Sequence, residues 1–272
     1  MHSASPLKVG IVGVGAIGRV MATALDRGQI RAVLSALSDQ DHENASTFAA
    51  QLRTPPSVVC LDQLVERSDL IVEAASQAAL LEIVPKALRS RKDLLVMSVG
   101  GLLGHDDWFR HAEEQGCRIY IPSGAIAGLD GLRAASMGRL NLVILTSRKP
   151  IAALRGSKYV TERKIDLESL REETVLFEGP PEEACAAFPS TSNVAASLRL
   201  SVGKSVEVRV LVIAAPGGSQ NVHEIQATGD FGRFRIVLEN VPSESNPRTS
   251  RLAALSALAT LDRIVRGSQT VF

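Results

Sequence analysis

The sequence predicts an α/β protein: an N-terminal doubly wound parallel sheet, then a C-terminal α+β domain with a mostly antiparallel sheet. Before Pro122, short continuous apolar runs alternate with segments of helical periodicity, which is typical of a parallel sheet covered on both faces. After Pro122, the segments are longer and alternate between apolar and polar residues, as in an antiparallel sheet with one packed face. These patterns predict domains at 1–122 and 123–245, followed by a C-terminal helix within 246–272.

The expected strands and helices of each domain can be assigned to separate segments of the sequence. In the first, strands are expected at 8–12, 32–37, 58–60, 70–75, 94–99 and 118–121, with helices at 17–25, 78–90 and 107–115. In the second, strands are expected at 206–214, 222–228 and 232–241, a helix at 193–200, and a hairpin turn at 215–219 joining the first two strands. An amphipathic helix at 249–265, started by Asn246-Pro247, is expected to pack back on the first domain.

The composition is that of an ordinary globular protein. Of the 272 residues, 45% are hydrophobic and 22% are charged, and the formal net charge is +1. This near-neutral balance, with 4% aromatic residues, gives no reason to expect nucleic acid or a membrane as a partner. The three cysteines match no metal-binding spacing, so no metal site is expected. No signal peptide or membrane span is recognisable, so we expect a cytoplasmic protein.

A glycine-rich turn follows the first expected strand and opens the first expected helix. The pattern Gly-x-Gly-x-x-Gly is formed by Gly13, Gly15 and Gly18, with Ala16 and Ile17 inside it. In a Rossmann domain the first glycine allows a tight turn, the second lets the backbone approach a pyrophosphate, and the third packs helix against strand. The free N–H groups of the helix then bind phosphate. These five residues therefore predict a dinucleotide site.

Three further residues at strand ends belong to this predicted site. Asp39 ends the second expected strand, at about the 20-residue spacing from the glycine turn that the motif requires. A carboxylate there accepts hydrogen bonds from the adenosine ribose and repels a 2′-phosphate, so NAD is preferred to NADP. Ala75 and Ser76 end another strand with small side chains that leave room for the cofactor. Together with the similar segment 98–101, they are equally compatible with ordinary strand-to-helix turns.

His223 is the histidine best placed for acid–base chemistry. It lies on an expected strand, on the same face as Ile225 and Ala227. Imidazole titrates nearest to neutral pH of all side chains, so His223 can serve as the base that hydride transfer from an amine or alcohol requires. From strand position alone, a hydrogen-bonded core histidine is the stronger interpretation.

Two polar segments in the second half of the chain have two interpretations each. Asn193 begins an apolar helix and looks like a helix cap. The segment Asn246-Pro247-Arg248-Thr249-Ser250 has the same character, and its arginine and exposed N–H groups can also bind a carboxylate. We therefore name Arg248, Thr249 and Ser250 as candidate substrate-binding residues.

These segments, taken in order, resemble the L-aspartate dehydrogenase family over nearly the whole chain. The Pro122–Asp130 block and the Asn-Pro-x-Thr-Ser segment are the more specific features, whereas the glycine turn is generic. The matching stretches are Gly10–Gly18, Ser98–Gly101, Pro122–Asp130, Leu176–Gly179, Phe188-Pro189, Asn193–Ala196, His223–Ile225 and Asn246–Ser250.

The resemblance implies an NAD(P)-dependent oxidative deamination of L-aspartate. Its product is iminosuccinate, which hydrolyses to oxaloacetate and ammonia or passes to NAD biosynthesis. The family's catalytic histidine falls on His223, and cofactor contacts fall on Ala127 and Asn193. The resemblance also implies a cytoplasmic homodimer, with a Rossmann domain and a mixed α/β catalytic domain that forms the dimer contact.

Two positions depart from the family pattern. Thr191 stands where members often have an asparagine, and Arg248 replaces the usual lysine of the Asn-Pro-Lys-Thr-Ser segment. Arginine keeps the charge but forms hydrogen bonds with a different geometry. These departures leave open a related two-domain dehydrogenase or imine reductase acting on another amino or hydroxy acid, with NADP as an alternative cofactor. An NAD-binding sensor without catalysis is the remaining alternative.

Overall fold

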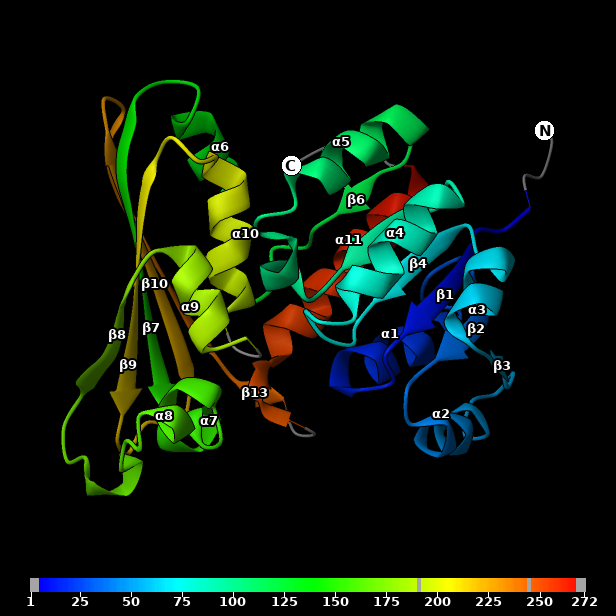
Figure 1. The fold of residues 1–272 in the computed structure, drawn as a ribbon, viewed down its shortest axis with the longest axis horizontal. Helices are drawn as coiled ribbons and strands as arrows, with labels where there is room; N and C mark the ends of the chain where they lie inside the picture. The colour runs from blue at the N-terminus through cyan, green and yellow to red at the C-terminus, as the bar shows by residue number, and fades with distance from the viewer. Residues whose placement is uncertain (1–4, 190–191, 244–245, 268–272) are drawn as a thin grey trace. The chain divides into compact units, whose positions relative to one another are not determined.

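The structure is a computed structural model that describes residues 5–189, 192–243 and 246–267 (Figure 1). It contains two compact units, one formed by Met1–Pro122 with Ala254–Phe272 and the other by Ser123–Ala253. The first unit contains a parallel sheet and the second a mostly antiparallel one, which confirms the predicted fold class. Among the described residues, no helix is both long enough and apolar enough to cross a membrane.

The first unit is built on a six-stranded parallel sheet with the strand order β3-β2-β1-β4-β5-β6. Its strands are β1 (Lys8–Val12), β2 (Val33–Ser38), β3 (Ser57–Val58), β4 (Leu70–Glu73), β5 (Asp93–Val96) and β6 (Ile119–Tyr120). Its helices are α1 (Ala16–Asp26), α2 (His42–Ala49), α3 (Leu61–Arg67), α4 (Leu80–Arg89), the 3-10 helix η1 (Val99–Leu102), α5 (Asp106–Gln115) and most of α11 (Arg251–Arg266).

Helices cover both faces of this sheet, which explains why its strands are continuous apolar runs. Val9 and Ile11 of β1 point into a core formed with α1, α2 and α11, where Ala257 and Leu261 are fully buried. Gly10, between them, faces α3 so closely that a Cβ atom there would meet Leu64. Because helices occupy both faces, a ligand can approach only at the carboxyl ends of the strands, where open α/β sheets bind their ligands.

The second unit is built on a five-stranded sheet with the order β11-β10-β7-β9-β8. Its strands are β7 (Leu140–Pro150), β8 (Thr174–Gly179), β9 (Glu207–Ala215), β10 (Asn221–Gly229) and β11 (Gly232–Asn240), and β12 (Pro242–Ser243) pairs with β13 (Asn246–Ser250). Its helices are α6 (Leu129–Ala135), α7 (Ile151–Leu154), α8 (Lys158–Glu162), the 3-10 helix η2 (Leu167–Ser169), α9 (Pro181–Ala187) and α10 (Asn193–Val202). All neighbouring strands of the large sheet are antiparallel except β7 and β9.

One face of this second sheet packs against helices α6, α9 and α10 (Figure 1). Ile225 of β10 pairs with Ile236 of β11, and Ile236 lies against Gly128 at the start of α6. His223 therefore belongs to this helix-covered face, because it lies two residues from Ile225 on the same strand. Glu224 and Gln226 project from the opposite face.

Three expectations about local structure are wrong. Strands β9 and β10 form no hairpin, because β7 lies between them in the sheet. The segment Asn246–Ser250 is strand β13, so α11 begins at Arg251, two residues later than expected. Asn193 is the first residue of α10, so Ser192 and not Asn193 occupies the cap position. In the first two cases strand pairing overrides a local turn or helix-start signal.

Candidate active site

The glycine turn between β1 and α1 has the geometry of a dinucleotide-binding loop. Gly13 has φ +97°, its N–H donates to the Ser38 carbonyl at 2.8 Å, and a Cβ atom there would lie 2.5 Å from the Ala74 backbone. A Cβ at Gly18 would collide with the carbonyl oxygen of Gly13. Gly15 has no heavy atom within 4 Å of its Cβ position, so the backbone is open to a ligand there. The three glycines thus meet the three separate demands of the motif.

The first turn of α1 begins directly behind this open position. Gly15 is the cap residue and Ala16 and Ile17 are the first two helical residues, with no acidic side chain in the first turn. The partial positive charge of the helix N-terminus is therefore not neutralised from within the turn. An anionic phosphate in front of Gly15 would be stabilised by it.

Asp39 is held against the glycine turn by two backbone hydrogen bonds. One carboxylate oxygen accepts from the Val14 N–H at 2.6 Å and the other accepts from the Asp41 N–H at 2.9 Å. Each oxygen keeps a second lone pair, which can accept from a ribose hydroxyl. The position of Asp39 therefore fits the predicted role in binding the adenosine ribose.

A cavity of about 670 Å³ brings most of the predicted cofactor residues of this unit together. It is lined by Val12, Gly13, Gly15, Ser38, Asp39, Gln40, Leu61, Ala74, Ala75, Ser76, Ala78, Ala79, Glu82 and Ile83. The small side chains of Ala75 and Ser76 lie at the end of β4, next to the glycine turn. The cavity is chemically suited to an adenine dinucleotide, with an apolar wall, a carboxylate and open backbone.

Glu73, at the end of β4, is a buried residue that the sequence reading missed. Its side chain is fully buried and accepts hydrogen bonds from the Ala75 N–H at 2.8 Å, the Ser98 hydroxyl at 2.8 Å and the Ser98 N–H at 2.9 Å. Burial raises the pKa of Glu73, although these hydrogen bonds favour its ionised form. Glu73 thus joins the loops after β4 and β5, including the segment 98–101. The sequence feature that could have identified Glu73 is its position as a single acidic residue at the end of an apolar strand.

His223 is buried on β10 and held by a side chain of the neighbouring strand. It is 2% exposed, and its Nδ1 lies 2.9 Å from the hydroxyl oxygen of Ser147 on β7. Burial, and then the charge of Lys149, lower the pKa of His223 to about 3. The imidazole is therefore neutral at neutral pH. Because Nδ1 is engaged by Ser147, Nε2 is the ring atom able to take a proton from a ligand.

Lys149 is the second buried ionisable group near His223, and the sequence reading missed it as well. It is 2% exposed, and burial lowers its pKa to about 8. Its position near the end of β7 was not recognised because the strand at 140–150 was not expected. A lysine at a strand end is normally read as a solvated residue.

The other predicted site residues belong to the second unit. Ala127 is exposed in the loop before α6, and the adjacent Ala125 carbonyl accepts a hydrogen bond from Asn240 at 3.0 Å. Asn193 is half-buried at the start of α10. Ser250 is buried and Thr249 is half-buried at the end of β13. The Arg248 side chain and Thr191 lie outside the described residues.

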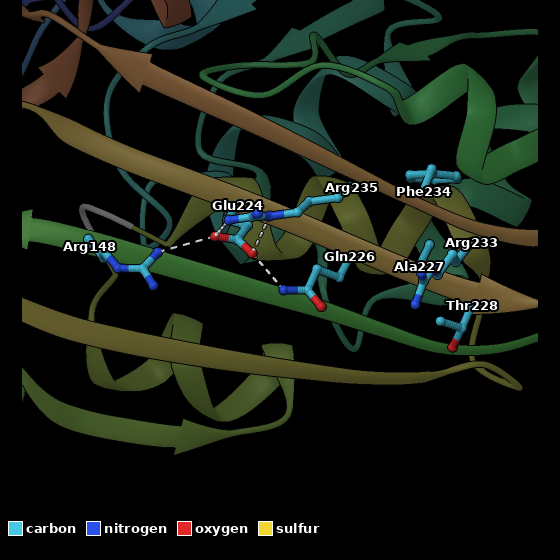
Figure 2. Close-up of a pocket in the computed structure, with 8 residues that line it drawn as sticks. All are labelled: Arg148, Glu224, Gln226, Ala227, Thr228, Arg233, Phe234 and Arg235. Atoms are coloured by element: carbon cyan, nitrogen blue, oxygen red, sulfur yellow. Dashed lines mark hydrogen bonds and ion pairs between the residues drawn. The ribbon is translucent and has the colours of Figure 1, made fainter.

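A second polar cluster lies on the opposite face of the same sheet, around Glu224 (Figure 2). Arg235 donates two hydrogen bonds to the Glu224 carboxylate, at 2.8 and 2.9 Å, Gln226 donates one at 2.6 Å, and Arg148 donates one at 3.4 Å. Arg235 is the largest of the influences that hold the pKa of Glu224 below its usual value. These residues, with Ala227, Thr228, Arg233 and Phe234, line a cavity of about 660 Å³. Arg235, Gln226 and Arg148 all donate to Glu224, the one carboxylate of this lining.

Two family models match this chain in succession. The NAD-binding domain of homoserine dehydrogenase matches residues 13–122, and the C-terminal domain of aspartate dehydrogenase matches residues 130–264. The first match covers the glycine turn and Asp39. The second covers Ser147, Lys149 and His223.

Several relatives named L-aspartate dehydrogenase align with nearly the whole of this chain. The L-aspartate dehydrogenase of Methanosarcina acetivorans is 46% identical over 267 residues, which are 97% of this chain and 98% of that protein. The L-aspartate dehydrogenase of Bradyrhizobium diazoefficiens is 40% identical over 259 residues, 95% of this chain and 92% of that protein. The crystal structure of aspartate dehydrogenase from Thermotoga maritima has the same fold, with a TM-score of 0.69 and 24% identity, covering 98% of this chain and 99% of that one. This chain is an NAD(P)-dependent dehydrogenase and belongs to the aspartate dehydrogenase family.

Proposed function

We propose that this chain oxidises L-aspartate with NAD to iminosuccinate, which hydrolyses to oxaloacetate and ammonia. The relatives that cover the chain are named L-aspartate dehydrogenases. The observation that carries the proposal is His223, a buried and neutral imidazole whose Nδ1 is held by Ser147. Such an imidazole is a base that is fixed in position before the substrate arrives.

The glycine turn and Asp39 would hold the cofactor. Gly13 and Gly15 leave the backbone open to the pyrophosphate, and Asp39 presents carboxylate oxygens to the adenosine ribose. Gly18 lets α1 approach the turn, and Ala75 and Ser76 line the same cavity. NAD supplies the acceptor for the hydride. The carboxylate of Asp39 favours NAD over NADP because it repels a 2′-phosphate.

Two further cofactor contacts are proposed in the second unit from the family resemblance. Ala127 lies in an exposed loop, and Asn193 presents an amide at the start of α10. Both positions are compatible with contact to a ligand, because neither side chain is fully buried.

His223 would move the proton of the reaction. As the hydride leaves the α-carbon, Nε2 accepts one proton from the amino group, and the nitrogen lone pair forms the C=N bond of iminosuccinate. Once this proton has passed back to the imine nitrogen, Nε2 can take a proton from the water that adds to the C=N carbon. A negative charge placed nearby by the substrate would raise the pKa of His223 and strengthen it as a base.

The substrate carboxylates need cationic or N–H partners. We propose that Arg248, Thr249 and Ser250 supply some of them, since a hydroxyl or backbone N–H can donate to a carboxylate. Thr249 and Ser250 lie on β13, which contacts α7 directly after the end of β7. This places them in the same part of the unit as the end of the strand that carries Ser147.

We also propose that the chain acts as a cytoplasmic homodimer and that its iminosuccinate is used in NAD biosynthesis. The sheet face that carries Glu224 supports the dimer, because it exposes 53% of Val175 and 47% of Val237. Apolar side chains on one face of a sheet indicate a surface that another chain covers. Sedimentation of the purified protein tests the dimer.

The proposed reaction is tested by initial rates of NADH formation at several substrates. L-Aspartate is compared with L-glutamate, L-alanine and L-malate, each with NAD and with NADP at equal concentration. We expect L-aspartate with NAD to give the highest kcat/KM. A higher value for another amino or hydroxy acid would contradict the proposed substrate, and a higher value with NADP would contradict the role of Asp39.

A further inference from the structure

Four buried polar side chains gather on the helix-covered face, where β7 ends and β10 begins. Ser147 and Lys149 are two residues apart on β7, and Asn221 and His223 are two residues apart on β10. The antiparallel register pairs His223 with Ser147, so Asn221 and Lys149 form the next pair on this face. Each of the four is 2 or 3% exposed. So many polar groups on a packed face require a chemical reason.

Asn221 contains an unsatisfied polar atom in this cluster. Its side-chain oxygen Oδ1 is buried and has no hydrogen-bond partner among the described residues. Buried polar atoms are almost always hydrogen-bonded, and exceptions mark places where a water, ion or ligand belongs. An amide oxygen only accepts hydrogen bonds, so the missing partner is a donor.

Lys149 contributes a positive charge to the same cluster. Its charge acts on His223, where it helps to lower the pKa of the imidazole, so the two side chains are electrostatically coupled. A buried ammonium favours a carboxylate as its ligand, because the pair forms strong charge-assisted hydrogen bonds away from water. The cluster thus combines a cation, an acceptor and a base.

We propose that Lys149 and Asn221 form, beside His223, the subsite that recognises an amino dicarboxylate. Lys149 binds one carboxylate of the substrate, and Asn221 Oδ1 accepts a hydrogen bond from the amino group whose proton His223 removes. This inference rests on the proposed oxidation of aspartate and adds the residues that recognise the substrate. Burial and, after it, the charge of Lys149 lower the pKa of His223 in the free protein, and a bound carboxylate would offset the second of these two effects.

Succinate separates the two roles, because it has both carboxylates of aspartate and no amino group. In Lys149→Met, the KM for L-aspartate and the inhibition constant of succinate both rise about 100-fold, as expected for loss of one partner of a buried ion pair. In Asn221→Ala, the KM for L-aspartate rises about 10-fold, the usual effect of losing one buried hydrogen bond, while succinate inhibition is unchanged. The NADH dissociation constant, measured by fluorescence, is unchanged in both variants.

Matched controls are available in the same unit. Lys158 is 64% exposed on α8 and Asn141 is exposed on β7, so Lys158→Met and Asn141→Ala make the same chemical changes away from the cluster. Both controls retain the wild-type constants. Lys149→Gln replaces Lys149→Met if the latter fails to show a wild-type unfolding transition.

Each outcome decides one of the assignments. If wild-type protein oxidises aspartate and the Lys149 variants keep the wild-type succinate inhibition, Lys149 does not bind the carboxylate. If Asn221→Ala weakens succinate as much as aspartate, Asn221 does not recognise the amino group. If the wild type itself does not oxidise aspartate, the proposed function fails. Calorimetric titration of succinate into NAD-loaded wild type and Lys149→Met then still decides the role of Lys149.

Discussion

The two units bury their ionisable groups in opposite ways. In the first, Glu73 accepts three hydrogen bonds from Ala75 and Ser98 and so is satisfied entirely from within the unit. In the second, Asn221 Oδ1 has no hydrogen-bond partner in the part of the chain that the structure describes, and burial lowers the pKa of Lys149 to about 8 and that of His223 to about 3. Burial displaces the pKa of Glu73 as well, so the difference lies in the hydrogen bonds: Glu73 is fully partnered, whereas the Asn221 oxygen can still accept a hydrogen bond from a ligand. The comparison therefore separates a buried residue that holds two loops together from a buried cluster that we propose to bind substrate.

Replacing His223 gives the largest expected effect on activity. His223→Ala removes the base, so kcat for aspartate oxidation falls by about 10²–10⁴-fold. The NADH dissociation constant stays at its wild-type value, because His223 is not among the residues proposed to hold the cofactor. Steady-state rates and NADH fluorescence measure the two quantities. Full activity in this variant would show that His223 is not the base, and the buried cluster of the second unit would then have no catalytic role to set against Glu73.

Replacing Glu73 has its main effect on stability. Glu73→Leu leaves the two N–H groups and the hydroxyl that it now satisfies without an acceptor, which costs about 3 kcal/mol of unfolding free energy. Urea denaturation of the variant and the wild type measures the difference. A variant as stable as the wild type, with activity lost, would show that Glu73 is catalytic and that the comparison is drawn wrongly.

Replacing Asp39 tests the preference for NAD over NADP, and the expected effect on kcat/KM is of intermediate size. Asp39→Asn removes the negative charge and retains one oxygen that can accept the Val14 N–H. The ratio of kcat/KM with NADP to kcat/KM with NAD rises by about 10-fold, as expected for one lost charge-assisted hydrogen bond and one lost repulsion. An unchanged ratio would mean that nicotinamide preference is set elsewhere.

The pH dependence of the inhibition constant of succinate shows the smallest expected effect, and it tests the protonation state of Lys149 directly. Lys149 binds a carboxylate in its protonated form, which is lost as pH rises through its pKa of about 8. The inhibition constant therefore rises about tenfold per pH unit above this value and is constant below it. His223, with a pKa of about 3, stays neutral throughout the range from pH 6 to 9 and adds no step. Lys149→Met is expected to show no such rise.

The geometry of the proposed cofactor site could be predicted from the sequence because its determinants are local. Gly13, Gly15 and Gly18 lie within one turn, and Asp39 follows on the adjacent strand at a spacing fixed by one strand-helix-strand unit. Their roles follow from backbone geometry, which a glycine pattern records directly. Glu73 was not recognised, because its donors come from loops after two different strands and no spacing rule connects them.

The histidine site could be predicted only in part, because its determinants are distant in sequence. His223 was identified, but Ser147 and Lys149 lie on β7, a strand that the sequence reading did not expect. The same omission made β9 and β10 look like a hairpin, although β7 separates them. Strand pairing across such distances depends on the packing of the whole unit and leaves no local pattern.

The place of α11 in the first unit has a consequence for how the protein is made. Ala257 and Leu261 complete the core against Val9 and Ile11, yet the ribosome adds them after the entire second unit. The first unit to emerge therefore has α1 and α2 on this face of its sheet but lacks α11 while the other unit is synthesised. A chain released early, before α11, has the glycine turn but an incomplete core. Such a fragment exposes the apolar residues that Ala257 and Leu261 cover in the full chain, so we expect it to be less stable than the full chain.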